Sequence, residues 1–311
     1  MVGSHKRERV ALEASLLQGA NVHRPSVNSC LSGSCLSGTI ALFYKTMQIL
    51  LANAKIMRPS FAVAPISEPR FQSEANLLAS AMASLNVDDL ALQLDCSRKL
   101  AAENWQRFQH FFSTEPGAAL LAYFGQAYKH LKAETLSAAD LSFAQSHLWI
   151  TSFLYGLLRP LDGIVPYRME HTVKLETTGQ KSIAAFWKER LTDFLIDAAK
   201  ADDGRLLHLA TEEYEHLFDW KRVRRELTVV QPIFYVEKAG RLKVQSVWAK
   251  SLRGAMARHV ITHRLSAPAL LASFAYEGFA YEPRLGEPAF PHFVRREAIL
   301  QDAAASVKSL R

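Results

Sequence analysis

From Met47 onward, helical and strand patterns alternate along the chain, and no segment repeats another. Apolar residues spaced three and four apart indicate amphipathic helices, whereas short apolar runs between turn residues indicate buried strands. A β-hairpin is predicted over residues 237–240, where Gly240 supplies the positive φ of a tight turn. Hairpins combined with helical crossovers predict a single α+β domain with a mixed central sheet flanked by helices.

The same patterns predict boundaries for the individual elements. Periodic stretches predict helices at residues 74–85, 88–94, 99–111, 139–146, 183–199 and 249–264. Apolar runs predict strands at residues 48–52, 120–124, 148–155, 173–175, 206–210, 228–236, 241–247, 273–281 and 292–294. The order of these strands within a sheet does not follow from the sequence.

Residues 1–46 differ in character from the rest of the chain. They mix charges with Ser, Gly and Asn and show no sustained helical or strand period. We expect a poorly ordered N-terminal extension, or a start codon placed too far upstream, followed by a folded domain at 47–296 and a C-terminal tail at 297–311. The extension holds five Lys and Arg against two Glu, a net +3 of the chain's +7. The body therefore keeps a smaller basic excess, and the placement of its charges matters more than their number.

The composition excludes several classes of protein. No run of 18 or more apolar residues occurs, so no membrane-spanning helix is predicted. Three cysteines are too few for a disulfide framework in 311 residues and fit a reducing compartment. Cys30 and Cys35 lack a second Cys or His pair at metal-binding spacing, and no two-His-one-carboxylate spacing occurs. We therefore expect no metal site and no cofactor.

The predicted helix at residues 249–264 has two distinct sides. One side is apolar, and His259 and His263 share it, which favours core or boundary positions over a metal pair. The other side is cationic and is formed by Lys250, Arg253, Arg258 and Arg264 around Gly254 and Ala257. We expect that a phosphate backbone can approach the helix closely at the glycine. The alternative is a solvated basic face, with Gly254 at a crossing between helices.

Two predicted strands end in residues that suit a binding site. Lys55 follows the first strand, and the carboxyl edge of an open α/β sheet is where ligands bind. The alternative is an ordinary surface lysine. The short strand that ends near residue 210 is followed directly by Thr211, Glu212, Glu213 and Tyr214. The threonine can cap a helix whose early acids favour the helix dipole, or the acids can serve in proton transfer.

The helices at 88–94 and 99–111 are joined by a tight turn and form a helical hairpin. Helix-hairpin-helix modules bind backbone phosphates through the amides of the turn, usually around glycines. This turn contains no glycine, although Arg98 and Lys99 lie next to it. An ordinary αα-hairpin and a DNA-binding module both remain open.

The segment at residues 154–171, LYGLLRPLDGIVPYRMEH, places charged residues beside rigid or flexible backbone positions. Two prolines and a glycine fix the course of the loop. Arg159 and Arg168 would then lose little conformational entropy on binding a phosphate. The other polar residues are Asp162, Tyr167 and Glu170, of which the two acids can orient the arginines or take part in chemistry.

Five blocks of the chain, taken in order, closely resemble the YaaA family of bacterial peroxide-stress proteins. The blocks are LLANAKIM, LYGLLRPLDGIVPYRME, LATEEY, WAKSLRGAMAR and FAYEGFAYEP, and the resemblance covers residues 47–295. It implies a single α+β domain with a positively charged cleft, a cytoplasmic location, and DNA binding with a helix-hairpin-helix element at residues 88–111. It also implies a role in limiting oxidative damage when peroxide meets intracellular iron. The N-terminal extension has no counterpart.

Block by block, the resemblance singles out Lys55, Arg159, Asp162, Tyr167, Arg168, Glu170, Glu212, Tyr214, Lys250, Arg253 and Glu277. One departure lies at the end of the first strand. The family usually has Ser-Pro-Ala-Lys there, whereas this chain has Ala52, Asn53, Ala54 and Lys55. The lysine is kept and the hydroxyl is lost, which puts any role of that hydroxyl in doubt.

Two functions fit these features. In the first, which we expect, the cleft binds the backbone of duplex or branched DNA without sequence preference, through Lys55, Arg98, Lys99, Arg159, Arg168, Lys250, Arg253 and Arg258. In the second, the protein is an enzyme on a small anionic substrate such as a nucleotide or nucleobase, and protons are moved by Glu170, Glu212 or Tyr214. In either case we expect Asp162, Tyr167 and Glu277 to support the residues that contact the ligand. A closed pocket of a few hundred Å³ favours the enzyme, and a groove about 20 Å wide favours the duplex.

Overall fold

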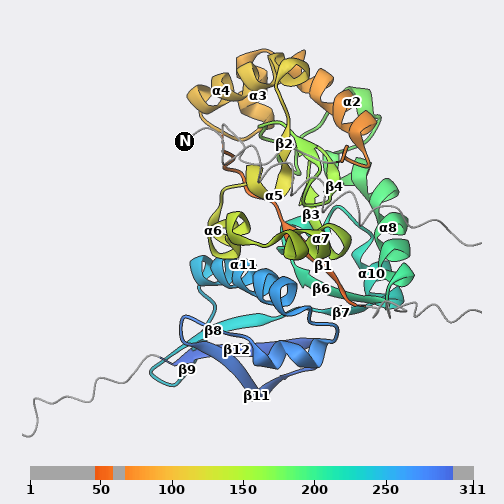
Figure 1. Cartoon of the computed structure of the whole chain (residues 1–311). Helices are drawn as coiled ribbons and strands as arrows, with labels where there is room; N and C mark the ends of the chain where they lie inside the picture. Colours follow the sequence, from red (N-terminus) through yellow and green to blue (C-terminus); the bar gives the residue numbers. More distant parts are fainter. Residues whose placement is uncertain (1–45, 59–66, 297–311) are drawn as a thin grey trace, which may run out of the picture.

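The computed structural model describes residues 46–58 and 67–296. Nearly all of the predicted extension with Cys30 and Cys35, and the tail at 297–311, lie outside the described residues. The described residues form a mixed α/β structure with two five-stranded sheets and one two-stranded ribbon (Figure 1). The ribbon pairs β2 (Gly117–Ala118) with β5 (Gly163–Ile164). The single central sheet predicted from the sequence is therefore two separate sheets.

The first sheet is mostly parallel and has the strand order β4-β3-β1-β6-β7. β1 lies in the centre and pairs in parallel with β3 on one side and β6 on the other. β7 continues in parallel beside β6, whereas β4 returns antiparallel beside β3. The strands are β1 (Gln48–Ala52), β3 (Leu148–Ser152), β4 (Gly156–Leu158), β6 (Arg205–Leu209) and β7 (Thr228–Val230). β1 is nearly continuous in apolar residues because helices cover both faces of a parallel sheet.

The second sheet has the order β10-β11-β12-β8-β9, with β12 and β8 parallel and the other pairs antiparallel. The predicted hairpin at 237–240 is confirmed, because β8 and β9 pair around Ala239 and Gly240, which both have positive φ. The strands are β8 (Ile233–Lys238), β9 (Arg241–Lys243), β10 (Ala275–Tyr276), β11 (Phe279–Glu287) and β12 (Phe290–Arg296).

Several strand predictions are wrong. Residues 173–175 form no strand, residues 273–281 divide into β10 and β11 around a turn, and the strand predicted at 241–247 ends at Lys243, shortly before α11. Two further cases have a clear physical reason. Residues 228–236 were expected as one strand, but β7 ends at Val230 and β8 starts at Ile233 in the other sheet. Pro232 lies between them and has no amide proton for a strand ladder, so the chain passes from one sheet to the other there. Residues 120–124 form no strand, because α5 (Ala119–Ala122) occupies them, and a short apolar run cannot distinguish a buried helix from a strand.

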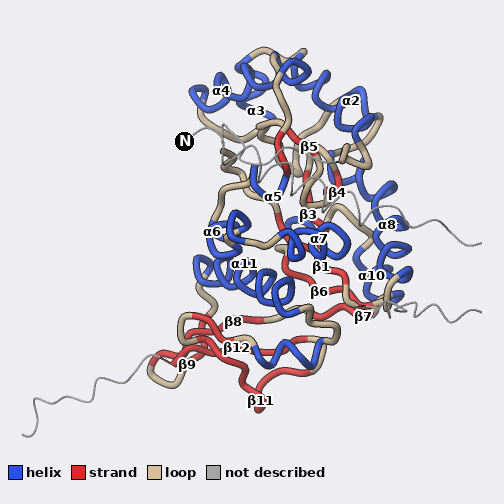
Figure 2. The backbone as a smooth tube through the Cα atoms, viewed as in Figure 1, coloured by secondary structure: helices blue, strands red, loops and turns tan. Residues whose placement is uncertain are grey.

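Helices pack around both sheets, and α11 (Ser246–His263) lies between them, in contact with β1, β6 and β8 (Figure 2). α2, α3 and α4 gather at the end of the molecule away from the second sheet. The predicted helices are confirmed to within a few residues, as α2 (Gln72–Ala83), α3 (Val87–Gln93), α4 (Arg98–Gln109), α7 (Ala138–His147), α8 (Ile183–Ala201) and α11. Further helices are α6 (Gln126–Leu131), α9 (Glu212–Glu215) and α10 (Trp220–Glu226). No helix in the described part of the chain is long and apolar enough to cross a membrane.

Candidate functional site

A cavity of about 480 Å³ lies at the carboxyl ends of β1 and β6. Its walls include the residues that directly follow the two strands, from Ala52 to Ile56 and from Thr211 to Tyr214. The chain continues from β1 to β3 on one side and from β6 to β7 on the other, so the two connections diverge at this point. Open α/β sheets bind ligands at such a switch point. We name this hollow the β1–β6 cavity.

Three cations line the β1–β6 cavity, namely Lys55 after β1, and Lys250 and Arg253 on α11. The two lysines are exposed, whereas Arg253 is half-buried. Burial lowers the pKa of the Arg253 guanidinium, and no carboxylate opposes this effect. Within the described residues, Arg253 has neither a hydrogen-bond partner nor an ion-pair partner. A desolvated charge without a partner is costly, so this position fits an anion that completes it.

The part of the predicted cationic side of α11 that surrounds Gly254 and Arg258 is covered by α6. Gly254 packs against α6, and a Cβ atom there would lie 1.8 Å from the carbonyl oxygen of Ala127. Arg258 donates hydrogen bonds to the carbonyl oxygens of Leu131 and Lys132 at the end of α6. The expectation that a phosphate backbone approaches the helix at Gly254 is therefore wrong, because α6 occupies that position. The alternative, a glycine at a helix crossing, is confirmed.

Glu170 connects the loop at residues 154–171 to the β1–β6 cavity. Its carboxylate pairs with Lys55 at 2.7 Å and with Arg168 at 2.8 Å. Its side chain is only 9% exposed. Because the two cations neutralise its negative charge, the Glu170 carboxylate does not repel an anionic ligand in the cavity. Glu170 is thus placed to orient both Lys55 and Arg168, and a role in proton transfer would require it to leave them.

A buried hydrogen-bond network lies beneath the β1–β6 cavity, and the donors in it can be assigned. The hydroxyl of Ser152 accepts hydrogen bonds from two backbone N–H groups of the following turn, so it donates its own proton to Tyr167 at 2.6 Å. The side-chain amide of Asn53 also donates to the Tyr167 oxygen, at 3.0 Å. Tyr167 has then accepted twice and donates to Tyr123 at 2.8 Å.

Tyr214 joins the same network from the far side of the cavity. Its hydroxyl donates to the side-chain oxygen of Asn53, and its ring stacks on Phe153 with the centroids 4.7 Å apart. Burial raises the pKa of Tyr214 well above its ordinary value, so the hydroxyl stays protonated. Tyr214 therefore serves as a fixed donor to Asn53 in this arrangement.

Two carboxylates occupy the β6 side of the cavity, where α9 begins. Glu213 lies 3.5 Å from Nδ1 of His171, whereas Glu212 is exposed and has no partner among the described residues. Thr211 is at the N-cap position of α9, but its side chain makes no capping hydrogen bond, so the predicted cap is wrong. Glu212 and Glu213 are the carboxylates of the cavity that can exchange a proton with a bound molecule.

Arg159 and Asp162 lie away from the cavity, at the amino end of the parallel strands. The Arg159 guanidinium packs 3.2 Å from the centroid of the Trp149 ring and donates to the carbonyl oxygen of Leu148, where β3 begins. Asp162 accepts hydrogen bonds from the backbone N–H of Arg159 and from the hydroxyl of Ser67. The expectation that one rigid loop presents Arg159 and Arg168 to the same phosphate is therefore wrong, because the loop passes from one end of the sheet to the other.

The α3–α4 hairpin has the geometry of an ordinary αα-hairpin. Arg98 pairs with Asp88 at 2.7 Å, and both side chains are exposed. Lys99 is also exposed, at the start of α4. The amides of the turn already donate to carbonyl oxygens of α3, as those of Leu94, Asp95 and Cys96 do. These amides are thus occupied by the hairpin itself.

Two further observations concern residues outside the cavity. Glu277, singled out by the family resemblance, is exposed in the turn between β10 and β11, with a φ of 49°, and does not line the cavity. Across the described ranges, no group of three or more His, Cys, Asp or Glu side chains could hold a metal ion.

Sequence reasoning did not single out Asn53, Tyr123 and Tyr128 as parts of a site. Asn53 bridges two tyrosines, and the hydroxyl of Tyr128 donates to the carbonyl oxygen of Ala52 at 3.0 Å. A signal for Asn53 was present, because it directly follows β1 at the edge where ligands bind. Tyr123 and Tyr128 carried no such signal. The sequence pattern predicts a buried strand at residues 120–124, which contains Tyr123, and predicts no element at Tyr128.

Comparison with known proteins confirms the family that the five sequence blocks resemble. The family model described as "Peroxide stress protein YaaA" matches residues 47–285. A protein of Phocaeicola vulgatus, named UPF0246 protein, is 43% identical over 240 residues, covering 76% of this chain and 94% of that protein. Proteins of the same name from Bacteroides thetaiotaomicron and Jannaschia sp. are each 41% identical, over 245 and 233 residues, which is 78% and 74% of this chain and 95% and 90% of theirs. The chain therefore belongs to the YaaA family of peroxide stress proteins.

Proposed function

We propose that this protein acts in the response to peroxide by binding a small anionic molecule, such as a nucleotide or nucleobase derivative, in the β1–β6 cavity. The observation that carries the proposal is the half-buried guanidinium of Arg253, which has no partner among the described residues. An anion there would offset the cost of its burial and would also meet Lys55 and Lys250. A volume of about 480 Å³ suits a molecule of nucleotide size.

The remaining walls suit the rest of such a molecule. Ala54, Ile56 and Leu209 offer apolar surface for an uncharged or planar part. Proton transfer, if the bound molecule reacts, is assigned to Glu212 or Glu213, since Tyr214 donates to Asn53 and Glu170 is held by two cations.

DNA binding is a second candidate, and one observation favours it. The charged groups of Arg58 and Lys129 lie 4.7 and 4.9 Å from the centroid of the Phe124 ring. Phe124 directly precedes Gly125, which lines the cavity, so the two cations over its ring lie next to the wall of the β1–β6 cavity. Cations around an aromatic ring suit the backbone phosphates and an unstacked base of a nucleic acid. In this candidate the link to intracellular iron is indirect, because bound DNA is shielded from the oxidants that iron and peroxide generate.

Binding measured by fluorescence anisotropy separates the two candidates. The full-length chain is titrated with a labelled nucleoside monophosphate, a duplex and a branched DNA at several salt concentrations. Three proteins are compared, the wild type, Arg253→Gln, and the control Arg241→Gln at an exposed position on β9. The first candidate predicts nucleotide affinity at least about tenfold weaker in Arg253→Gln alone, because a charge-assisted bond is lost.

Other outcomes are equally informative. DNA affinity that falls steeply with salt, depends on Arg58 and Lys129, and is unaffected by Arg253→Gln would favour the second candidate. Absence of binding to any nucleotide or nucleobase would sink the first.

A further inference from the structure

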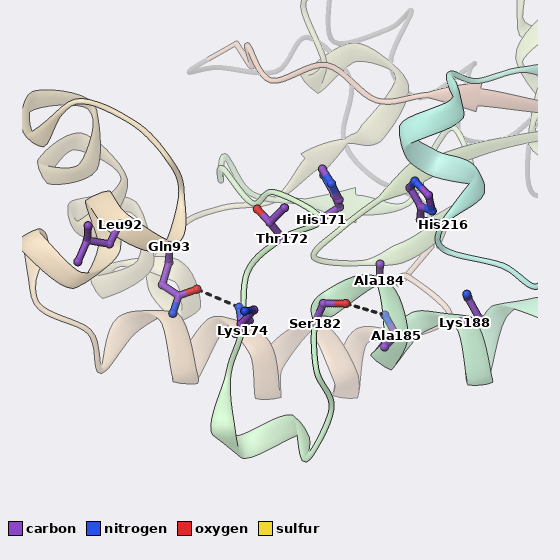
Figure 3. Close-up of a pocket in the computed structure, with 10 residues that line it drawn as sticks. All are labelled: Leu92, Gln93, His171, Thr172, Lys174, Ser182, Ala184, Ala185, Lys188 and His216. Atoms are coloured by element: carbon purple, nitrogen blue, oxygen red, sulfur yellow. Dashed lines mark hydrogen bonds between the residues drawn. The ribbon is translucent and has the colours of Figure 1, made fainter.

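A second hollow, of about 700 Å³, lies on the other side of α9 from the β1–β6 cavity. Its walls come from four separate segments, which are the end of α3, the loop at 171–174, the first turns of α8, and His216 after α9. Figure 3 shows Lys174 and Gln93 on one side of this hollow and Lys188 and His216 on the other. We name it the α8 hollow. It shares no lining residue with the β1–β6 cavity.

The charge of the α8 hollow is positive. Lys174 and Lys188 line it from different segments, and neither ammonium has an ion-pair partner among the described residues. The rings of His171 and His216 lie nearly parallel, 17° apart in plane, with centroids separated by 6.1 Å. No carboxylate lines the hollow. Acids stand beside it: Glu213 lies next to His171, and an adjoining depression that shares Lys188 and His216 with the hollow is also lined by Glu212, Glu215 and Asp219.

We propose that the α8 hollow binds a phosphate group, at a site separate from the β1–β6 cavity. Two lysines on opposite sides can neutralise a compact anion, and lysine ammonium groups bind phosphate as point charges without a fixed geometry. The hydroxyl of Thr172 and the imidazole N–H groups add further hydrogen-bond donors.

The proposed phosphate site does not use the backbone N–H groups in the first turn of α8. The N–H of Ile183 donates to the carbonyl oxygen of Val173, and the N–H of Ala185 donates to the hydroxyl of Ser182 (Figure 3). The backbone N–H of Lys174 is the donor to the side-chain oxygen of Gln93, at 2.9 Å, which fixes the segment that carries the lysine. The side chains of Lys174 and Lys188 are therefore the groups that the proposal needs, and their positions are set by contacts away from their charges.

The first test is calorimetric titration of the full-length protein with inorganic phosphate. The test variant is Lys174→Gln with Lys188→Gln, and the matched control is Arg241→Gln with Lys243→Gln, which removes two exposed cations on β9. We expect phosphate to bind at least about tenfold more weakly to the test variant and with wild-type affinity to the control. Equal affinity in both double variants, or a loss caused by Arg253→Gln alone, would overturn the proposal. Unfolding midpoints of all variants establish that each protein is folded.

The source of the phosphate is resolved by competition. Displacement of inorganic phosphate by a nucleoside monophosphate, and not by the nucleoside, would identify a terminal phosphate as the ligand. Displacement by a short DNA duplex alone would identify a backbone phosphate. Binding of none of the three probes at the two lysines would overturn this proposal and leave the assignment of the β1–β6 cavity unaffected, because that assignment depends on Arg253.

Discussion

Tyr214 donates its hydroxyl proton to the side-chain oxygen of Asn53, so the residue after β1 and the helix after β6 are tied together across the β1–β6 cavity. The same Asn53 side chain donates to Tyr167 through its nitrogen. Both ends of one amide are thus used, and the two tyrosines are held in fixed positions.

Tyr214→Phe tests whether the hydroxyl has any role beyond this bridge. The ring remains on Phe153, and Asn53 loses one donor, so we expect unfolding to become easier by about 1 kcal/mol. Affinity for the nucleotide should be unchanged, because the hydroxyl proton is already donated to Asn53. Denaturant unfolding and anisotropy measure the two quantities. A large loss of affinity with unchanged stability would show that Tyr214 contacts the ligand.

Gly254→Ala tests the helix crossing by the sign of its effect. A Cβ atom would clash with the carbonyl oxygen of Ala127, so we expect the free energy of unfolding to fall by about 1–3 kcal/mol. An exposed glycine in the middle of a helix would instead gain about 1 kcal/mol on replacement by alanine. A more stable variant in chemical denaturation would therefore mean that this face of α11 is open.

Arg258→Ala distinguishes a structural arginine from a phosphate contact. Arg258 satisfies two carbonyl oxygens at the end of α6, and a hydrogen bond from a charged group is worth about 1.5–3 kcal/mol. We expect the variant to lose stability of that order and to bind nucleotide and DNA as the wild type does. The comparison with Arg241→Ala, on the exposed surface of β9, separates lost contacts from lost charge. Weaker DNA binding by Arg258→Ala at unchanged stability is the outcome that contradicts us.

His208 predicts the direction of a pH effect on stability. Its side chain is fully buried beside Glu215, and burial lowers its pKa below the ordinary value of 6.5. The unfolded chain therefore takes up a proton near pH 6.5 that the folded protein does not. Stability is complete above that pH and falls below it, by at most about 1.4 kcal/mol per pH unit for one histidine. Thermal unfolding of wild type and His208→Gln between pH 7.5 and 5.5 measures this, and an equal decline in both proteins would exclude His208 as its cause.

Much of the fold could be predicted from local patterns. Helical periodicity located α2, α3, α4, α7, α8 and α11, and the hairpin signal at Gly240 located β8 and β9. The division into two sheets could not be predicted from periodicity, because it depends on a single residue, Pro232, within an apolar run. Strand order likewise follows from contacts between distant segments.

For the site, the position of residues relative to strand ends was the useful signal. Lys55 and Glu212 follow β1 and β6, and the structure brings them to one cavity. Arg159 could not be placed in this way, because its loop spans both ends of the sheet. The role of Gly254 depended on a partner helix, α6, that the sequence did not predict. Residues at strand ends were therefore easier to assign than residues whose role depends on a distant neighbour.

The central claim is that the half-buried guanidinium of Arg253 binds an anion in the β1–β6 cavity. Thermal unfolding of Arg253→Gln with and without a nucleoside monophosphate tests this claim most directly. Without ligand, we predict a variant at least as stable as the wild type, since it removes a desolvated charge that has no partner. With ligand at 100 times the wild-type dissociation constant, the wild type should gain about 2.7 kcal/mol, and a variant that binds tenfold more weakly should gain about 1.4 kcal/mol. A variant that is strongly destabilised without ligand, yet stabilised by ligand as much as the wild type, would contradict the claim.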